Sequence, residues 1–195
     1  MIFWISNLYN YKSLKNNETI SPAATEWQTQ FIRALKKHSK HKVFIINYNY
    51  SKFWPFGKIY LKKNLFSLKD VKSYSFNYIN LPFLKDINIK REIRKKINEF
   101  KKFEKKIIFT YNFDKVAIST AKELKVNNHI KWISIVADFD RKDQKIIEQK
   151  VEKADLVVYL SNYAFKQSNI KSKILIQGGI DKIEKKKFKK IYSFL

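Results

Sequence analysis

Cysteine is absent from this sequence of 195 residues. Without thiols the chain can form neither a disulfide framework nor a thiolate metal site, which suits a reducing compartment. Its three histidines, His38, His41 and His129, are scattered and lack the spacing of metal ligands. We therefore expect no metal site.

Glycine is scarce, and the chain has only Gly57, Gly178 and Gly179. It contains no Gly-x-Gly-x-x-Gly fingerprint and no Walker loop, which argues against a dinucleotide-binding or P-loop enzyme. It also lacks the Gly-x-Ser-x-Gly elbow of the α/β-hydrolases.

Long apolar runs are missing as well. None approaches the roughly 20 residues that span a bilayer. The apolar start, Met1 to Ile5, lacks a basic region and stops at Ser6, so it favours a first strand over a signal peptide. An apolar fraction of 45% is enough for a substantial core, and the length predicts one domain or two small ones.

Acidic residues are outnumbered 41 to 17 by lysine and arginine, giving a formal charge of +24. Such a charge suggests nucleic acid as a partner. Arginine, however, reads bases and phosphates bidentately, and only four are present: Arg33, Arg91, Arg94 and Arg141. Lysine spread among much Asn, Ile, Phe and Tyr indicates an AT-rich coding bias. Nucleic acid is thus disfavoured, and an anionic membrane surface stays open.

The pattern that organises the chain lies in residues 106–140. An apolar run at 107–109 ends at Tyr111-Asn112, a helical pattern follows, and a β-branched run occupies 130–136. Strand, helix and strand within about 30 residues predict a βαβ unit with parallel strands.

Similar alternation continues on both sides of this unit. Further strands are predicted at 2–5, 42–47, 73–81, 156–160 and 173–176, and helices at 22–38, 88–106, 141–153 and 163–168. Ser21 and Pro22 are typical of a helix start. In the helix at 141–153, Ile146, Ile147 and Val151 should face inward. We predict a Rossmann-like α/β fold, with a mainly parallel sheet covered by helices on both faces.

Two segments allow two interpretations each. Phe53, Trp54 and Phe56 are unusually apolar for a loop; we favour packing against the domain edge over a contact with an acceptor or membrane. The helix at 88–106 carries an apolar stripe, and its remaining surface is crowded with basic residues, among them Lys90, Arg91, Arg94, Lys95, Lys96, Lys101 and Lys102. That pattern fits a solvated outer face and a helix lying on anionic lipid equally well.

Function is expected beyond the carboxyl ends of the parallel strands, where ligands bind in such sheets. Tyr111 and Asn112 end one predicted strand, and Asp138 follows another. Asp140 and Asp143 fit the start of the next helix, so Asp138 is the carboxylate left for a ligand.

Four motifs, in this order, resemble the N-terminal, acceptor-side domain of family-4-like glycosyltransferases of the GT-B fold. They are Ile108-Phe109-Thr110-Tyr111-Asn112, Trp132 to Asp138, Ala154 to Ser161, and Gln177-Gly178-Gly179-Ile180-Asp181. The resemblance implies one half of a GT-B enzyme and a retaining sugar transfer from a nucleotide-sugar donor. It implies no metal and no cofactor, because the nucleotide sugar is a substrate of the complete enzyme.

The resemblance also implies which residues line the substrate cleft. These substrate-binding candidates are Thr25, Glu26, Tyr111, Asn112, Asp138, Ser161, Asn162, Gly178 and Gly179. The sequence departs from the family twice. Tyr192 stands where a glutamate should follow Glu184, and no histidine ends the strand at Ala137-Asp138.

We therefore expect residues 1–181 to form the acceptor-side domain and residues 182–195 a linker and the start of an absent C-terminal domain. The chain would be a fragment, a truncated product or one subunit of a split enzyme in polysaccharide biosynthesis, inactive alone. Its expected partners are a glycan or lipid-linked acceptor and a separate C-terminal-domain polypeptide. Its expected location is cytoplasmic, with peripheral contact to the inner membrane face as an option. The alternative is a basic, non-enzymatic module that binds a polyanion such as nucleic acid or an acidic glycan.

Overall fold

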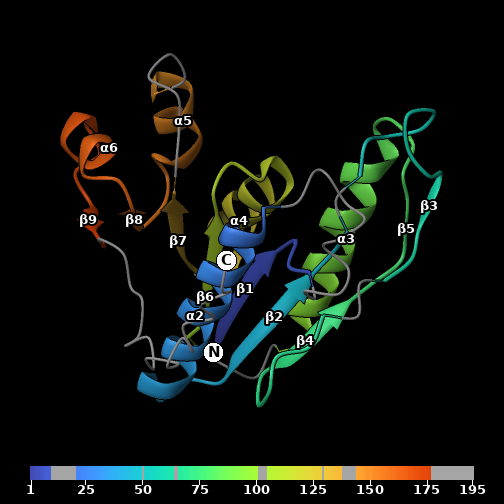
Figure 1. The fold of residues 1–195 in the computed structure, drawn as a ribbon, viewed down its shortest axis with the longest axis horizontal. Helices are drawn as coiled ribbons and strands as arrows, with labels where there is room; N and C mark the ends of the chain where they lie inside the picture. Colours follow the sequence, from blue (N-terminus) through green and yellow to red (C-terminus); the bar gives the residue numbers. More distant parts are fainter. Residues whose placement is uncertain are drawn as a thin grey trace, which may run out of the picture.

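The computed structural model describes residues 1–9, 21–49, 51–63, 66–100, 105–128, 130–137 and 144–176. These residues form an α/β fold built on one seven-stranded, all-parallel sheet (Figure 1). In spatial order its strands are β4 (Lys72–Ser75), β2 (Val43–Asn47), β1 (Ile2–Ser6), β6 (Ile107–Tyr111), β7 (Lys131–Val136), β8 (Leu156–Tyr159) and β9 (Lys173–Leu175). The predicted Rossmann-like class and parallel sheet are confirmed.

The strand order reverses beside β1. From β1 the chain moves outward through β2 to β4, returns to β6 on the other side of β1, and continues outward to β9. Ile2 is level with Val43 of β2 and with Ile107 of β6, so the three strands run in step. Their carboxyl ends therefore meet at one edge, where open α/β sheets bind ligands.

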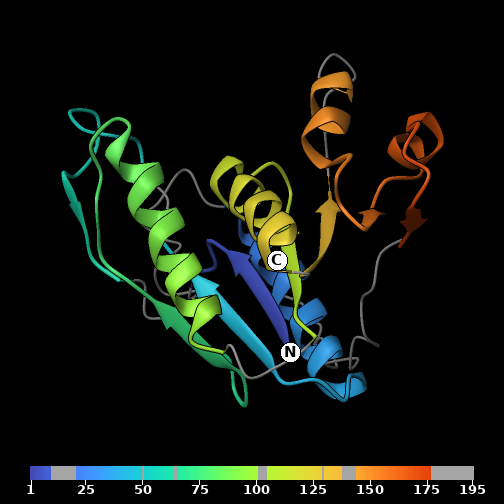
Figure 2. The same ribbon diagram turned by 180° about the vertical axis from the view of Figure 1, so that it is seen from behind.

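Helices cover both faces of the sheet (Figures 1 and 2). Their bounds are α2 (Pro22–His38), α3 (Leu84–Asn98), α4 (Lys115–Asn128), α5 (Gln144–Val151) and α6 (Asn162–Gln167). One core layer joins α2 to the sheet through Ile32, Trp4 and Ile45. The other layer lies between the sheet and α3 and α4, and Figure 2 shows these helices in front. No helix among the described residues is long and apolar enough to cross a membrane.

The central strands are largely apolar because both of their faces are covered. All five residues of β1 and all five of β2 are buried, which explains the four apolar residues that precede the polar end of each strand. Helix α2 begins as predicted, since the Ser21 hydroxyl accepts a hydrogen bond from the Ala24 N–H at 3.2 Å and Pro22 follows. It ends at His38, also as predicted.

The segment predicted as one strand at 73–81 is two strands. β4 ends at Ser75, and β5 (Tyr78–Ile79) pairs antiparallel with β3 (Tyr60–Leu61) in a separate ribbon that lies beyond α3 (Figure 1). The alternating pattern predicted extended backbone correctly, but it could not reveal that the chain changes partner at residues 76–77.

Two predicted helices have different limits in the structure. The helix at 88–106 is α3, which starts at Leu84 and ends at Asn98, before the chain enters β6. Its stripe of Ile89, Ile93 and Ile97 is buried, as predicted. The helix at 141–153 is α5; Val151 is buried there, but Ile146 is 51% exposed.

The inward orientation predicted for Ile146 is therefore wrong. Five residues separate it from Val151, which is about 140° around a helix of 3.6 residues per turn. The two side chains consequently point to different sides of α5. The structure does not describe the side chain of Ile147.

The favoured interpretation of the aromatic loop is also wrong. Phe53, Trp54 and Phe56 do not pack against the domain edge; they are 48%, 49% and 75% exposed. The backbone beneath them satisfies its hydrogen bonds with Asn80, which leaves the aromatic side chains outside.

Candidate functional site

A cleft of about 480 Å³ opens at the carboxyl ends of β1, β2 and β6, at the point where the strand order reverses. Residues from five segments line it: the residue after β1, the first turns of α2, the residue after β2, the start of α3, and the connection from β6 into α4. They are Asn7, Ser21, Ala24, Thr25, Gln28, Tyr48, Lys85, Asp86, Ile89 and residues 111–116.

Buried amides hold the loop after β1 and the helix that follows it. Asn47, at the end of β2, accepts a hydrogen bond from the Leu8 N–H at 2.7 Å and donates to the Leu8 carbonyl at 2.9 Å. Gln28 of α2 accepts from the Trp4 indole N–H at 3.1 Å and from the Ser6 hydroxyl at 2.5 Å. The wall of the cleft on this side is thus tied to β1 and β2.

Asp114 joins the floor of the cleft to helix α4. Its carboxylate accepts hydrogen bonds from the Val116 and Ala117 N–H groups at 3.0 Å each, which makes it the cap of α4. The buried Tyr48 hydroxyl donates to the same carboxylate. Burial raises the pKa of Asp114 above its ordinary value, and these hydrogen bonds oppose the rise. Burial and the nearby Asp114 charge raise the pKa of Tyr48 well above 10, so it stays a neutral donor.

Lysine forms the opposite side of the cleft. Lys85, in the first turn of α3, donates from Nζ to the Ser51 carbonyl at 2.7 Å. Burial lowers the pKa of Lys85, while the charges of Asp86 and Asp114 oppose this effect. The exposed Lys115 follows at the start of α4. The cleft therefore offers cationic groups together with carboxylate, amide and hydroxyl groups.

Asn112 stands between these two sides. Its backbone has φ 54°, a left-handed conformation that asparagine tolerates better than most residues, and its N–H donates to the Ile135 carbonyl at 2.7 Å. Its side-chain Oδ1 is buried and has no hydrogen-bond partner in the described part of the chain. Because buried acceptors are nearly always paired, a ligand that donates a hydrogen bond would meet this need.

The structure brings some of the predicted substrate-binding residues together and separates others. Thr25, Tyr111 and Asn112 line the cleft. Glu26 faces a neighbouring hollow on α2 and accepts a hydrogen bond from Gln30 at 2.6 Å.

The remaining predicted residues lie elsewhere. Ser161 caps α6 by accepting from the Ala164 N–H, and the exposed Asn162 begins that helix; both follow β8, two strands from β6. Neither residue lines the cleft. Asp138, Gly178 and Gly179 lie outside the described residues.

Sequence reasoning missed most of the residues that line the cleft, among them Tyr48, Lys85 and Asp114. Asp114 carried a signal, because an aspartate directly before a helical pattern is a typical cap. Tyr48 lies 66 residues from the carboxylate to which it donates, so nothing local could indicate the contact.

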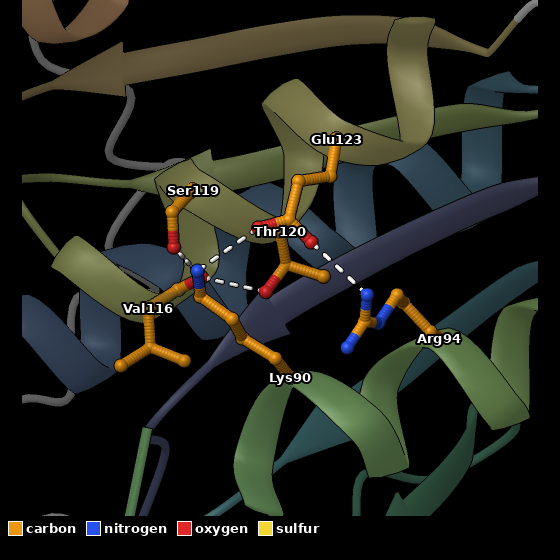
Figure 3. Close-up of polar contacts among 6 residues, drawn as sticks. All are labelled: Lys90, Arg94, Val116, Ser119, Thr120 and Glu123. Carbon is orange, nitrogen blue, oxygen red and sulfur yellow. Dashed lines mark hydrogen bonds and ion pairs between the residues drawn. The ribbon is translucent and has the colours of Figure 1, made fainter. Parts of the chain in front are cut away.

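A polar cluster joins the two helices whose first turns border the cleft (Figure 3). Glu123 of α4 accepts from Lys90 at 3.0 Å and from Arg94 at 3.2 Å, and both cations belong to α3. Within α4, the hydroxyls of Ser119 and Thr120 donate to the Val116 carbonyl at 3.1 Å and 2.7 Å. The cluster links α3 and α4 side by side.

These features define a Rossmann-like domain with a polar, partly cationic cleft at its topological switch point. Among the residues placed in the structure, no three His, Asp or Glu side chains gather closely enough to hold a metal ion. The groups lining the cleft are instead suited to a ligand rich in hydroxyl or anionic groups.

No protein-family model matches this sequence, and no curated protein matches it significantly. Among solved structures, the chain is similar to one described as sucrose-phosphate synthase from Thermosynechococcus elongatus. The two share 14% sequence identity with a TM-score of 0.48, and the match covers 92% of this chain and 90% of that chain.

Proposed function

We propose that this chain is the acceptor-side half of a GT-B-type glycosyltransferase. The complete enzyme would transfer a sugar from a nucleotide-sugar donor to a glycan or lipid-linked acceptor. Support comes from the order of the four sequence motifs and from the cleft. Two of the motifs, at 108–112 and 132–138, contain most of the neighbouring strands β6 and β7.

The role of the cleft would be to hold and orient the acceptor. In such a transfer the bond from the sugar to the nucleoside diphosphate breaks, and a bond from the sugar to the acceptor oxygen forms as that hydroxyl loses its proton. Much of the rate then comes from positioning and electrostatics. Lys85 and Lys115 could accommodate an acceptor phosphate, and the amides and hydroxyls could bind its sugar hydroxyls.

The observation that carries the proposal is Asn112, which lines the cleft at the switch point and whose buried Oδ1 has no hydrogen-bond partner among the described residues. A bound saccharide hydroxyl would donate the hydrogen bond that this oxygen lacks. Leaving a buried acceptor unpaired costs about 1–3 kcal/mol. Saccharide binding that fills this position should therefore depend strongly on the Asn112 side chain.

The test is Asn112→Gly, because glycine keeps the left-handed backbone and deletes only the side chain. Amide NMR shifts would be followed as acceptor saccharides and their phosphates are added. We expect shifts at Thr25, Asn112 and Lys115, and an affinity at least about tenfold weaker in the variant. Asp70→Gly is the matched control, since Asp70 is also left-handed (φ 64°) but lies outside the cleft.

Unchanged saccharide binding by Asn112→Gly, or shifts that avoid the cleft, would overturn this assignment. The competing function is a basic module that binds a polyanion, favoured by Lys85, Lys115 and the formal charge of +24. It predicts that heparin and duplex DNA bind without saccharide selectivity and that Asn112→Gly has no effect. Binding of that kind should weaken steeply with salt.

A further inference from the structure

The exposed aromatic loop and the ribbon beside it form an apolar surface that the cleft does not use. We call it the aromatic ribbon. It consists of Phe53, Trp54, Phe56, Ile59, Tyr60 and Ile79, which are 44% to 75% exposed. Scattered exposed apolar residues are ordinary, but a contiguous group of this kind usually marks an interaction site.

The ribbon's two faces show why this surface is unusual. Tyr60 pairs with Ile79 on one face, and Leu61 pairs with Tyr78 on the other. The second pair is buried, at 8% and 3% exposure, and forms the inner side. The outer side of such a strand pair is normally polar, yet here it carries Tyr60 and Ile79.

A rigid base holds these side chains outward. Buried Asn80 donates from Nδ2 to the carbonyls of Lys52 and Lys58 at 2.7 Å and 2.8 Å. Its backbone carbonyl accepts from the Trp54 N–H, and its N–H donates to the Ile59 carbonyl. Gly57 lets the loop close tightly, because a Cβ there would lie 2.1 Å from the Lys52 carbonyl oxygen. The exposed side chains are therefore fixed to a well-bonded backbone.

Charge indicates the kind of partner. Residues 51–63 contain no acidic residue, and their four lysines, Lys52, Lys58, Lys62 and Lys63, are all exposed. A second copy of this chain would bring like charges together. Nucleic acid would stack on the aromatic rings but would gain little from Ile59 and Ile79. Anionic lipid provides both headgroup charge for the lysines and an interface in which Trp, Tyr and aliphatic side chains settle.

We propose that the aromatic ribbon is a peripheral docking surface for an anionic lipid bilayer. The inference does not depend on the proposed transferase activity. The surface lies next to the cleft, because Lys85 lines the cleft and bonds to Ser51 at the start of the loop. Docking here would leave the cleft beside the bilayer.

Helix α3 is the weaker candidate for this contact. Two of its cations, Lys90 and Arg94, are directed to Glu123 of α4 (Figure 3). A third, Lys96, pairs with Glu99 at 2.7 Å and lies over the Tyr74 ring. The basic residues of α3 therefore do not form one free face.

Tryptophan fluorescence provides a direct test with the purified 195-residue protein. Trp4 and Trp132 are buried and Trp27 is partly buried, so Trp54 is the indole most exposed to lipid. Vesicles of phosphatidylcholine with phosphatidylglycerol should shift the emission to the blue, and brominated acyl chains should quench it. Trp54→Phe should abolish both signals while vesicle co-sedimentation persists. Absence of blue shift and quenching in the wild type would overturn the proposal.

Paired variants locate the contact. Phe56→Ser, and Lys58→Glu with Lys62→Glu, should each weaken vesicle binding at least about tenfold. The matched controls are Val126→Ser on α4, 79% exposed, and Lys36→Glu with Lys37→Glu on α2; both should bind as the wild type does. Equal losses in variants and controls would refute the assignment. A dimer that forms in the absence of vesicles and is dissociated by Phe56→Ser would also refute the assignment. Preferential binding of single-stranded RNA would refute it as well.

Discussion

At the scale of single residues, Asp114 shows how one side chain serves both a helix and a site. It caps α4, receives the buried Tyr48 hydroxyl and faces the cleft. Because its hydrogen bonds are already committed to the fold, we regard it as a positioning residue rather than a reacting one. Asn112, two residues earlier, has the opposite character, since its oxygen lacks a partner within the described part of the chain.

Asp114→Ala should destabilise the protein by about 1.5–5 kcal/mol. The loss of a helix cap costs roughly 0.5–2 kcal/mol, and leaving the Tyr48 hydroxyl buried without an acceptor costs about 1–3 kcal/mol. Asp114→Asn keeps a capping oxygen and should cost less than about 1 kcal/mol. Urea unfolding followed by circular dichroism measures both. Equal stability of the alanine variant and the wild type would contradict the structural role.

Asp114→Asn also predicts a pH dependence with a definite sign. The folded pKa of Asp114 lies above 3.8, so the folded state binds this proton more tightly than the unfolded chain does. As pH rises through the folded pKa, the wild type loses stability that the asparagine variant, which cannot ionise, retains. Between acidic and neutral pH, the free energy of unfolding of Asp114→Asn should therefore increase relative to that of the wild type. A decrease in the free energy of unfolding of the variant relative to the wild type over this pH range would refute the raised pKa of Asp114.

At the scale of elements, the contact between α3 and α4 shapes the side of the cleft. Ile89, Ile93 and Ile97 bury the apolar stripe of α3, and Glu123 joins the helices at the surface through Lys90 and Arg94. Burial of aliphatic side chains contributes about 1.5–3 kcal/mol each, whereas exposed ion pairs contribute about 0–1 kcal/mol. The isoleucines, rather than the ion pairs, hold the two helices together.

A double-mutant cycle on Arg94→Ala and Glu123→Ala should therefore give a coupling energy below about 1 kcal/mol, since Arg94 is 44% and Glu123 39% exposed at the side chain. The coupling should fall further at high salt. A cycle between Arg91→Ala and Glu123→Ala is the control, because Arg91 pairs with Glu92 instead. Coupling well above this range, or unaffected by salt, would show that the surface pair contributes more than its exposure allows.

At the scale of the whole molecule, the proposed function assigns the acceptor to this domain and the donor diphosphate to another. We therefore predict that the purified 195-residue chain transfers no sugar from any nucleotide-sugar donor by itself. A panel of radiolabelled donors with saccharide and lipid-linked acceptors measures this. Asn112→Gly, prepared in parallel, identifies contaminating activity, which would persist unchanged in that variant. Turnover that the variant abolishes would show that the chain binds its donor unaided.

The sequence alone determined the fold class and most elements, because these depend on patterns within a few residues of one another. Unbroken apolar runs such as residues 43–46 predict strands covered on both faces, and Ser21-Pro22 predicts the start of α2. Tyr111 and Asn112 were also predicted, because polar residues that end a buried parallel strand lie where ligands bind.

Only the tertiary structure decided which segments meet. The order of the strands brings Tyr48, Lys85 and Asp114 into one cleft from three distant parts of the chain. It also decided that Ser161 caps a helix and that Trp54 faces outward above Asn80. The physical reason is that periodicity reports which side of its own element a residue occupies, whereas burial and partners depend on what other segments pack against that side.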